Sequence, residues 1–160
     1  MHGAEGKVLL VRRYVPDDAL HVWALHEKSM AGMPAHENEN FWDDLLDIPR
    51  HFFALGGEFL VGQLGVELIA MGGFSPLSPR VIEIKRMRVH PDQQRKGFGK
   101  TVLFALEAAA LERGHLQVCL ETAVIQTSAL ALYRATGYKE TDRITKMGFE
   151  VVRMRKELVR

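Results

Sequence analysis

The first part of the chain changes from a short apolar run to a helical pattern of apolar positions. Residues 7–13 (KVLLVRR) are branched and apolar and predict a strand. Residues 16–18 (PDD) supply the proline and acidic side chains that are typical of a helix start. Leu20, Trp23 and Ala24 then recur at three- and four-residue spacing, so the sequence predicts a helix directly after the strand.

A second apolar stripe occupies residues 41–46, and it predicts another helix that Pro49 ends. The aromatic run over residues 50–57 (RHFFALGG) fits either a helix or an extended segment, and two glycines punctuate it. The pattern therefore leaves this part of the chain open.

The middle of the chain reads as a series of strands. Residues 59–64 and 66–74 are two extended runs about Gly65, which predicts a hairpin. Residues 81–89 form a third run. Strict alternation along this run would place Val81, Glu83, Lys85, Met87 and Val89 on one face.

Strands and helices alternate in the last third. Residues 99–113 predict a helix ended by Gly114, and residues 116–122 return to strand alternation. A short helix is expected over 128–136, followed by a closing hairpin of residues 138–144 and 151–154. With no repeat or linker in between, the order predicts one α/β domain over residues 1–160, three layers around a mixed sheet.

Composition narrows the class of protein without identifying it. The 160 residues are 47% hydrophobic and 26% charged with a formal net charge of +1, which predicts a globular chain and no nucleic-acid partner. No apolar run is long enough to cross a bilayer, and the start MHGAEGK lacks the features of a secretory signal. Cys119 is the only cysteine, and no His-Glu-x-x-His motif occurs, so we expect a cytoplasmic domain without a metal.

The segment from Val81 to Thr101 carries the strongest chemical signal. A strand leads into a loop with Gly97 and Gly99, and a helix begins at once. Free backbone N–H groups at a helix start bind anions, and glycine allows a phosphate to come close to the backbone. The basic side chains around the loop add positive charge; they are Arg95, Lys96 and Lys100. The loop therefore predicts a site for a pyrophosphate.

Three phosphate-binding loops compete for this segment. The nucleotide-triphosphate loop G-x-x-x-x-G-K-[ST] matches at Gly99-Lys100-Thr101, but Gln94 stands where its first glycine is required. The dinucleotide pattern G-x-G-x-x-G starts at Gly97 and fails at Val102. The pattern Q/R-x-x-G-x-G/A is satisfied in full by Gln94, Gly97 and Gly99.

With this loop the sequence resembles the GNAT superfamily of N-acetyltransferases. Residues 120–138 (LETAVIQTSALALYRATGY) are similar to a second pattern of that family, A-x-x-L-Y-x-x-x-G-[FY]. The resemblance extends from the first strand to the closing hairpin. It implies a GNAT-like three-layer α/β/α domain with a central mixed, mostly antiparallel sheet, which uses acetyl-CoA as co-substrate and acetylates a primary amine. Family habit also suggests a homodimer.

The resemblance assigns most cofactor contacts to one stretch of chain. In the family, the loop amides surround the CoA pyrophosphate and the preceding strand, which splays from its neighbour, pairs with the pantetheine arm. A backbone N–H near Met87 would polarise the thioester carbonyl. The family contacts carry over onto Met87, Arg88, Val89, Gln94, Arg95, Lys96, Gly97, Phe98, Gly99, Lys100 and Thr101. Gln126 stands where many relatives have an asparagine that contacts the cofactor arm.

Two residues are the candidates for acid–base chemistry. Tyr133 holds the position of the family tyrosine that protonates the departing thiolate, although a tyrosine on a helix is commonly a core residue. Glu83 matches the strand glutamate that serves some relatives as a base, directly or through water, although a strand glutamate is often only solvated. Glu121 is a weaker second candidate for the base.

The acceptor is the least defined part of the prediction. Trp23, Trp42, Phe52 and Phe53 are expected in the core, with some of them lining an acceptor site. A small-molecule amine is the leading hypothesis, and His36, Glu37 and Glu39 are candidates to meet it. Alternatives are a protein or peptide N-acetyltransferase, an acyl-CoA-binding regulatory module without catalysis, and a nucleotide-triphosphate enzyme.

Overall fold

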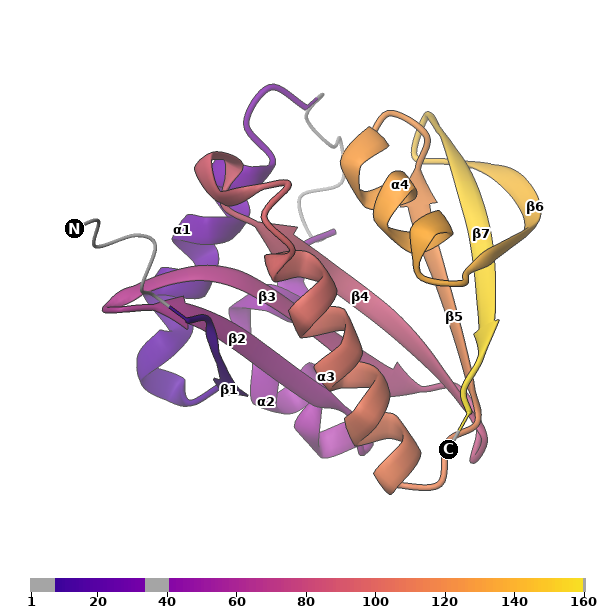
Figure 1. The fold of residues 1–160 in the computed structure, drawn as a ribbon, viewed down its shortest axis with the longest axis horizontal. Helices are drawn as coiled ribbons and strands as arrows, with labels where there is room; N and C mark the ends of the chain where they lie inside the picture. The colour runs from indigo at the N-terminus through magenta and orange to yellow at the C-terminus, as the bar shows by residue number, and fades with distance from the viewer. Residues whose placement is uncertain (1–7, 34–40, 160) are drawn as a thin grey trace.

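A computed structural model describes residues 8–33 and 41–159. The chain forms one seven-stranded sheet in the order β1-β2-β3-β4-β5-β7-β6, and all neighbours are antiparallel except β4 and β5 (Figure 1). The strands are β1 (Leu10–Arg13), β2 (Glu58–Leu64), β3 (Glu67–Pro76), β4 (Val81–Val89), β5 (Gln117–Ala123), β6 (Lys139–Lys146) and β7 (Phe149–Glu157). The helices are α1 (Ala19–Ser29), α2 (Ile48–His51), α3 (Phe98–Glu112) and α4 (Thr127–Ala135), with short 3₁₀ turns at Pro16–Asp18, Asp43–Leu46, Phe53–Leu55 and Pro91–Gln93.

Each face of the sheet has its own apolar core. One core joins α3 and α4 to the sheet through buried side chains such as Leu103, Leu106 and Leu130. The other joins α1 and α2 to the opposite face, with Val22 and Phe52 at its centre. The helices therefore lie on both faces of a mostly antiparallel mixed sheet, which confirms the predicted three-layer α/β/α architecture.

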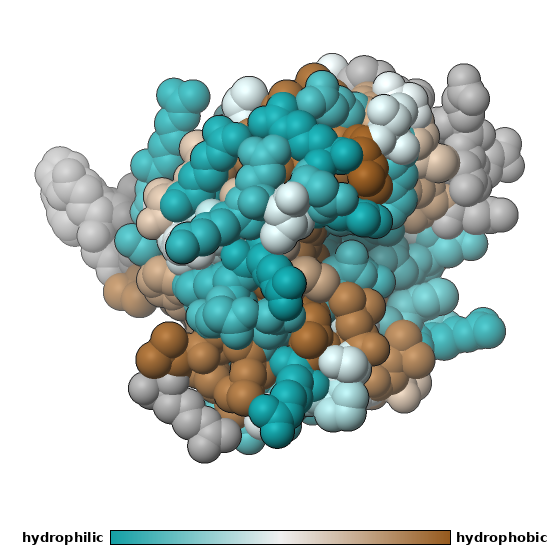
Figure 2. Space-filling model, turned by 90° about the vertical axis from the view of Figure 1, so that its right-hand side faces the viewer, coloured by the Kyte–Doolittle hydropathy of each residue, from teal (hydrophilic) through white to brown (hydrophobic). Residues whose placement is uncertain are grey.

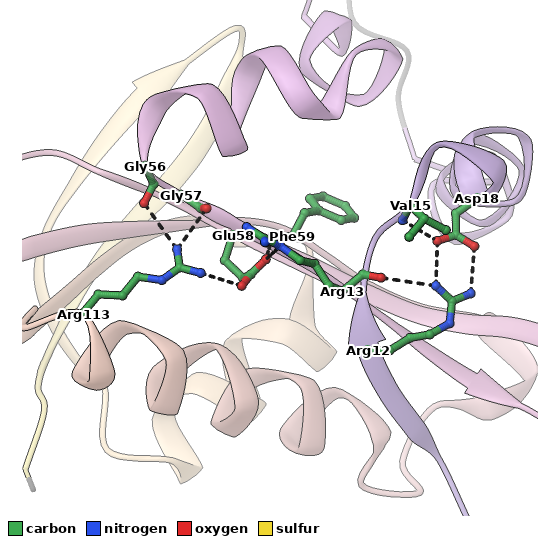
Figure 3. A network of polar contacts seen from close by, with 9 residues as sticks. All are labelled: Arg12, Arg13, Val15, Asp18, Gly56, Gly57, Glu58, Phe59 and Arg113. Carbon is green, nitrogen blue, oxygen red and sulfur yellow. Dashed lines mark hydrogen bonds and ion pairs between the residues drawn. The ribbon is translucent and has the colours of Figure 1, made fainter.

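A buried glutamate ties the first two strands to α3 (Figure 3). Glu58 Oε1 accepts a 2.8 Å hydrogen bond from Arg13 Nε, and its Oε2 accepts one of 2.7 Å from Arg113 Nη2. Beside this group, Arg12 donates two hydrogen bonds of 2.8 Å to the carboxylate of Asp18. The carboxylates are buried but the arginines that bind them are partly exposed, so solvent weakens each pair. The network nevertheless links β1 and α3 to β2.

Two predictions about the early helices need correction. Pro49 does not end a helix but lies in the first turn of α2, where its missing N–H is no loss. Asp47 caps this turn by accepting a hydrogen bond from Arg50 N at 3.3 Å. The ambiguous run that follows is helical, and Gly56 ends it in the left-handed conformation with φ +83°. The first strand begins at Leu10; Lys7 lies outside the described residues.

The predicted alternation along β4 is also wrong, because the strand contains a bulge. Gly73 pairs with Lys85 and Met71 with Arg88, so β4 has one residue more than β3 between these pairs. Arg86 adopts φ +60° at this point. Met87 and Val89 consequently pack on the same core as Ile82 and Ile84, away from the side of Glu83 and Lys85. A Cβ on Gly72 would overlap the Met87 sulfur, so a larger residue at this position would force the Met87 side chain to move.

The closing hairpin is confirmed and is longer than predicted. Figure 2 shows the side of the molecule that α4 and this hairpin form, with hydrophilic residues over most of its centre and hydrophobic residues along its lower edge. Charged residues on β6 explain the polar centre, because Arg143 pairs with both Glu140 and Glu150. Exposed pairs of this kind contribute little to stability, so the hairpin is held mainly by its pairing with β5 and by the buried side of β7.

Candidate active site

The loop between β4 and α3 has the backbone shape of an anion site. Arg95 and Gly97 both adopt left-handed conformations, with φ +63° and +85°, and Gly97 is the N-cap residue of α3. Gln94 anchors the loop, since its Nε2 donates to Val89 O at 3.4 Å. A Cβ on Gly97 would meet nothing within 4 Å, so the space beside this residue is open.

The amides of this loop lack partners among the residues that the structure describes. None of the seven backbone N–H groups from Gln94 to Lys100 donates a hydrogen bond to another described residue. The first amide of α3 that is bonded belongs to Thr101, which donates to Gly97 O at 3.1 Å. A run of unpaired amides at the positive end of a 15-residue helix is a strong anion-binding feature.

A cavity of about 740 Å³ extends from this loop between β4 and α4. Ten of the twelve predicted cofactor residues line it: Met87, Arg88, Val89, Gln94, Arg95, Gly97, Phe98, Gly99, Lys100 and Gln126. Lys96 and Thr101 do not; Lys96 Nζ bonds to Gln93 Oε1, and Thr101 Oγ1 donates to Gly97 O. The sequence did not identify the residues that close the other side of the cavity. They are Ser29 at the end of α1, Met30 and Met33 after it, and the face of α4 from Thr127 to Leu132.

The cavity exists because β4 and β5 separate. They pair only at Val81–Gln117, Ile82–Val118 and Glu83–Cys119, after which no register continues. From Lys85 onward the edge of β4 that faces β5 has no strand partner, in agreement with the expected splay. This leaves the backbone of residues 87–89 beside the cavity, although Val89 O already accepts hydrogen bonds from Ser29 Oγ and Gln94 Nε2.

Tyr133 closes the cavity from α4. Its side chain is 5% exposed and packs edge-on against Tyr138 with ring centroids 5.5 Å apart. Burial raises the pKa of Tyr133 and the positive charge of Arg88 lowers it, with a net shift upward. The phenol therefore keeps its proton at neutral pH. Tyr133 therefore packs in the core and also lines the cavity. Its role in packing does not exclude a role in catalysis.

A second cavity, of about 280 Å³, adjoins the first. The two share lining residues, namely Met30, Met33, Arg88, Ile125 and Gln126. Glu83 lines only the second cavity, where it lies 3.5 Å from Lys85 Nζ and its side chain is 24% exposed. Tyr133 and Glu83 are thus in neighbouring cavities on the two sides of Arg88. Apolar side chains form much of the second wall: Phe41, Trp42, Met147, Phe149 and Val151.

Arg86 organises one end of the second cavity. Its Nε donates to both carboxylate oxygens of Asp44, at 3.1 and 2.9 Å, and its Nη2 donates to Phe41 O at 2.9 Å. The guanidinium also lies over the Trp42 ring at 4.5 Å. The bulge in β4 is what turns Arg86 toward this segment, so the bulge positions part of the cavity wall.

Other candidates fall into clear roles. Glu121 lines the second cavity. Burial raises its pKa, but hydrogen bonds from Lys146 and Arg153 lower it by more, so the net shift is downward. A carboxylate paired in this way is a poor base. Gln126 is held at the end of β5, with Oε1 3.3 Å from Ala123 N. Of the four predicted core aromatics, Trp42 lines one of these two cavities and the other three line neither. His36, Glu37 and Glu39 lie outside the described residues.

The described residues give no support for a metal or a membrane span. Within residues 8–33 and 41–159, no cluster of three or more His, Cys, Asp or Glu side chains has the arrangement of a metal site. No helix in the same ranges combines the length and the apolar character needed to cross a bilayer.

The comparison with protein-family models identifies one family. A model of the acetyltransferase (GNAT) family matches residues 18–138. Human N-acetyltransferase 8 is 29% identical over 104 residues, and mouse probable N-acetyltransferase family 8 member 5 is 28% identical over 109 residues. These matches cover 61% and 65% of this chain but 46% and 48% of the relatives, so the chain spans about half their length.

Solved structures match over almost the whole chain. A GNAT-family acetyltransferase from Staphylococcus aureus has a TM-score of 0.85 at 16% identity, covering 95% of this chain and 100% of its own. An acetyltransferase from Salmonella typhimurium, solved with its cofactor acetyl-CoA, has a TM-score of 0.79 at 17% identity, covering 96% and 95%. At these identities the likeness establishes a shared fold.

Proposed function

Because the chain belongs to the acetyltransferase (GNAT) family, we propose that it transfers the acetyl group of acetyl-CoA to a primary amine. The observation that carries this proposal is the run of unpaired amides from Gln94 to Lys100 at the start of α3. Two adjoining cavities, one beside this loop and one beyond Arg88, give the cofactor and the acceptor separate places.

The residues of the first cavity fit acetyl-CoA. The loop amides, with Arg95 and Lys100 in the same lining, would hold the pyrophosphate, and the open space at Gly97 admits a phosphate close to the backbone. The unpaired edge of β4 at residues 87–89 would hold the pantetheine arm. Acetyl-CoA bound in this way would place its activated thioester at the junction of the two cavities.

Tyr133 is suited to assist the departure of the CoA thiolate. Its phenol stays protonated because burial raises its pKa, and it lines the cofactor cavity at the junction near Arg88. A neutral O–H donor stabilises the negative charge that develops on sulfur, and it passes its proton as the bond breaks. The positive charge of Arg88 helps the phenol to release that proton.

Glu83 is our candidate for the base that receives the amine proton. It lines the acceptor cavity and no strong ion pair holds it, since Lys85 lies 3.5 Å away. Glu121, the other carboxylate of this cavity, is engaged by Lys146 and Arg153 at 2.8 and 3.1 Å. Glu83 would act directly or through a water molecule, and a backbone N–H near Met87 would polarise the thioester carbonyl.

Calorimetric titration with acetyl-CoA, with ATP–magnesium in parallel, tests the cofactor assignment. We expect acetyl-CoA to bind and ATP–magnesium not to bind, because Gln94 replaces the glycine of a nucleotide-triphosphate loop. A panel of small amines and peptides, assayed by released CoA thiol, then tests transfer. Binding without turnover of any amine would favour the acyl-CoA-binding regulatory module, and turnover of peptides alone would favour a protein N-acetyltransferase.

The cytoplasmic location and the homodimer stay predictions of the sequence.

A further inference from the structure

Among the described residues that line the acceptor cavity, every charge is compensated except one. Arg86 is paired with Asp44, Lys85 lies near Glu83, and Lys146 is paired with Glu121. Arg88 is different, because no carboxylate among the described residues forms an ion pair with it. A half-buried guanidinium without an anion is unfavourable, so this group is suited to an anionic ligand.

The guanidinium of Arg88 is also fixed in direction. Its Nε lies 3.5 Å from His26 Nδ1, and its Nη1 donates to Met87 O at 2.9 Å. Trp42 lies beside it, with the guanidinium carbon 5.4 Å from the ring centroid. A guanidinium has five N–H donors, and these two bonds use two of them, which leaves three around Nη1 and Nη2. Two parallel N–H groups of this kind match the two oxygens of a carboxylate.

The position of Arg88 decides which ligand would supply that anion. Arg88 lines both cavities and therefore lies at their junction, whereas the loop that would hold the CoA phosphates is at the start of α3. The part of acetyl-CoA nearest the junction is the uncharged thioester. The anion must then belong to the acceptor, close to the amine that reacts.

The other residues that line the cavity indicate the chemistry of the rest of the acceptor. Aromatic and aliphatic side chains from three separate parts of the chain line it, including Trp42, Ile125 and Phe149. A ligand that places its amine and its anion at the junction would direct any further group into this apolar wall.

We propose that the acceptor is an α-amino acid with a large apolar side chain, whose carboxylate binds Arg88. This inference rests on the proposed function, since it names the acceptor of the same reaction. Arg88 would orient the amine toward the thioester by holding the carboxylate one carbon away, and the apolar wall would hold the side chain.

Three acceptors that share one side chain test the proposal: L-phenylalanine, L-phenylalaninamide and 2-phenylethylamine. In the wild-type protein we expect kcat/KM for L-phenylalanine to exceed that of the other two by about 10–100-fold, the usual value of hydrogen bonds to a charged group. Arg88→Gln should abolish this preference. Comparing the preference between variant and wild type cancels the different basicities of the three amines. Equal use of all three by the wild type would overturn the proposal.

Two control variants separate the carboxylate site from other roles of the charge. Arg88→Lys keeps the charge without the planar fork and should retain only part of the preference. Lys146→Gln removes a positive charge of the same cavity that is already paired, and it should retain the preference. If Arg88→Gln lowered turnover of all three acceptors equally, or weakened acetyl-CoA binding while the preference remained, Arg88 would serve the thioester and not the acceptor.

A binding measurement distinguishes failure of this inference from failure of the proposed function. Calorimetry of N-acetyl-L-phenylalanine and N-acetyl-2-phenylethylamine, each titrated into the protein with CoA present, needs no turnover. We expect only the first to bind, and Arg88→Gln to remove its binding. Such a result without catalysis would keep the carboxylate site and reject the transferase, whereas turnover of amines without any carboxylate preference would do the reverse.

Discussion

The Tyr138 hydroxyl donates a 2.6 Å hydrogen bond to Glu107 Oε2, and this bond is buried between the start of β6 and the middle of α3. Glu107 also accepts from Lys156 Nζ at 2.9 and 3.1 Å, so α3, β7 and the turn after α4 meet at one carboxylate. Because the ring of Tyr138 packs edge-on against Tyr133, the same cluster supports the tyrosine that lines the cofactor cavity.

Tyr138→Phe should therefore destabilise the protein without removing the active site. The ring remains, but a buried carboxylate loses its shortest hydrogen bond, which costs roughly 1–3 kcal/mol in the free energy of unfolding. Urea denaturation measures this cost, and calorimetry should show an unchanged affinity for acetyl-CoA. A loss of acetyl-CoA affinity in folded protein would mean that Tyr138 positions the cavity wall more directly than this packing indicates.

Tyr133→Phe should lower activity while leaving the stability of the protein almost unchanged. Phenylalanine keeps the packed ring, so the free energy of unfolding changes little, while the O–H that we propose protonates the departing thiolate is lost. We expect kcat to fall by about 10²-fold or more with little change in the affinity for acetyl-CoA, because a general acid acts in the transition state. Steady-state kinetics and calorimetry measure the two quantities. An unchanged kcat, with chemistry shown to be the slow step, would reject the role of Tyr133 as acid.

Gly97→Val should abolish acetyl-CoA binding, and Gly114→Val provides a matched control. Both glycines adopt a left-handed backbone, with φ +85° and +86°, and a Cβ at either would meet nothing within 4 Å. The strain in the two variants should therefore be similar, roughly 1–3 kcal/mol. The two glycines differ in position. Gly97 is the N-cap of α3 beside the cavity, whereas Gly114 lies after the C-terminal end of α3. Equal acetyl-CoA affinity in the two variants, measured by calorimetry, would contradict the loop assignment.

Most of the lining of the first cavity could be predicted from the sequence because its signals are local. Gln94, Gly97 and Gly99 lie within six residues, and the strand before them and the helix after them follow from apolar periodicity. The chemistry of an anion loop is a property of such a short segment. Lys96 and Thr101 do not line the cavity, because their side chains bond within the loop itself, and their contact with the cofactor stays a prediction.

The acceptor side could not be predicted, because its geometry depends on contacts between distant residues. Arg86 and Asp44 are 42 positions apart, and Arg88 and His26 are 62 positions apart. One residue with a left-handed backbone, Arg86, shifts the alternation of β4, and arginine gives no sequence signal for that conformation. The wall residues Met147 and Phe149 come from a hairpin that the sequence predicted only in outline.

His26 should make the stability of the protein fall in mild acid. Burial lowers its pKa to about 4, and the neighbouring charges of Arg88 and Arg86 lower it too, whereas in the unfolded chain the value is near 6.5. Between these values the unfolded chain binds a proton that the native protein does not, so stability is complete above pH 6.5 and is lost as the pH falls toward 4. The loss amounts to about 3 kcal/mol at most. Urea denaturation of His26→Gln at pH 7 and pH 4.5 should show a smaller drop than the wild type, while His21→Gln, at an exposed position of α1, should show the wild-type drop. The same drop in all three proteins would mean that the imidazole of His26 takes up its proton in the native state and that the pair with Arg88 opens in acid.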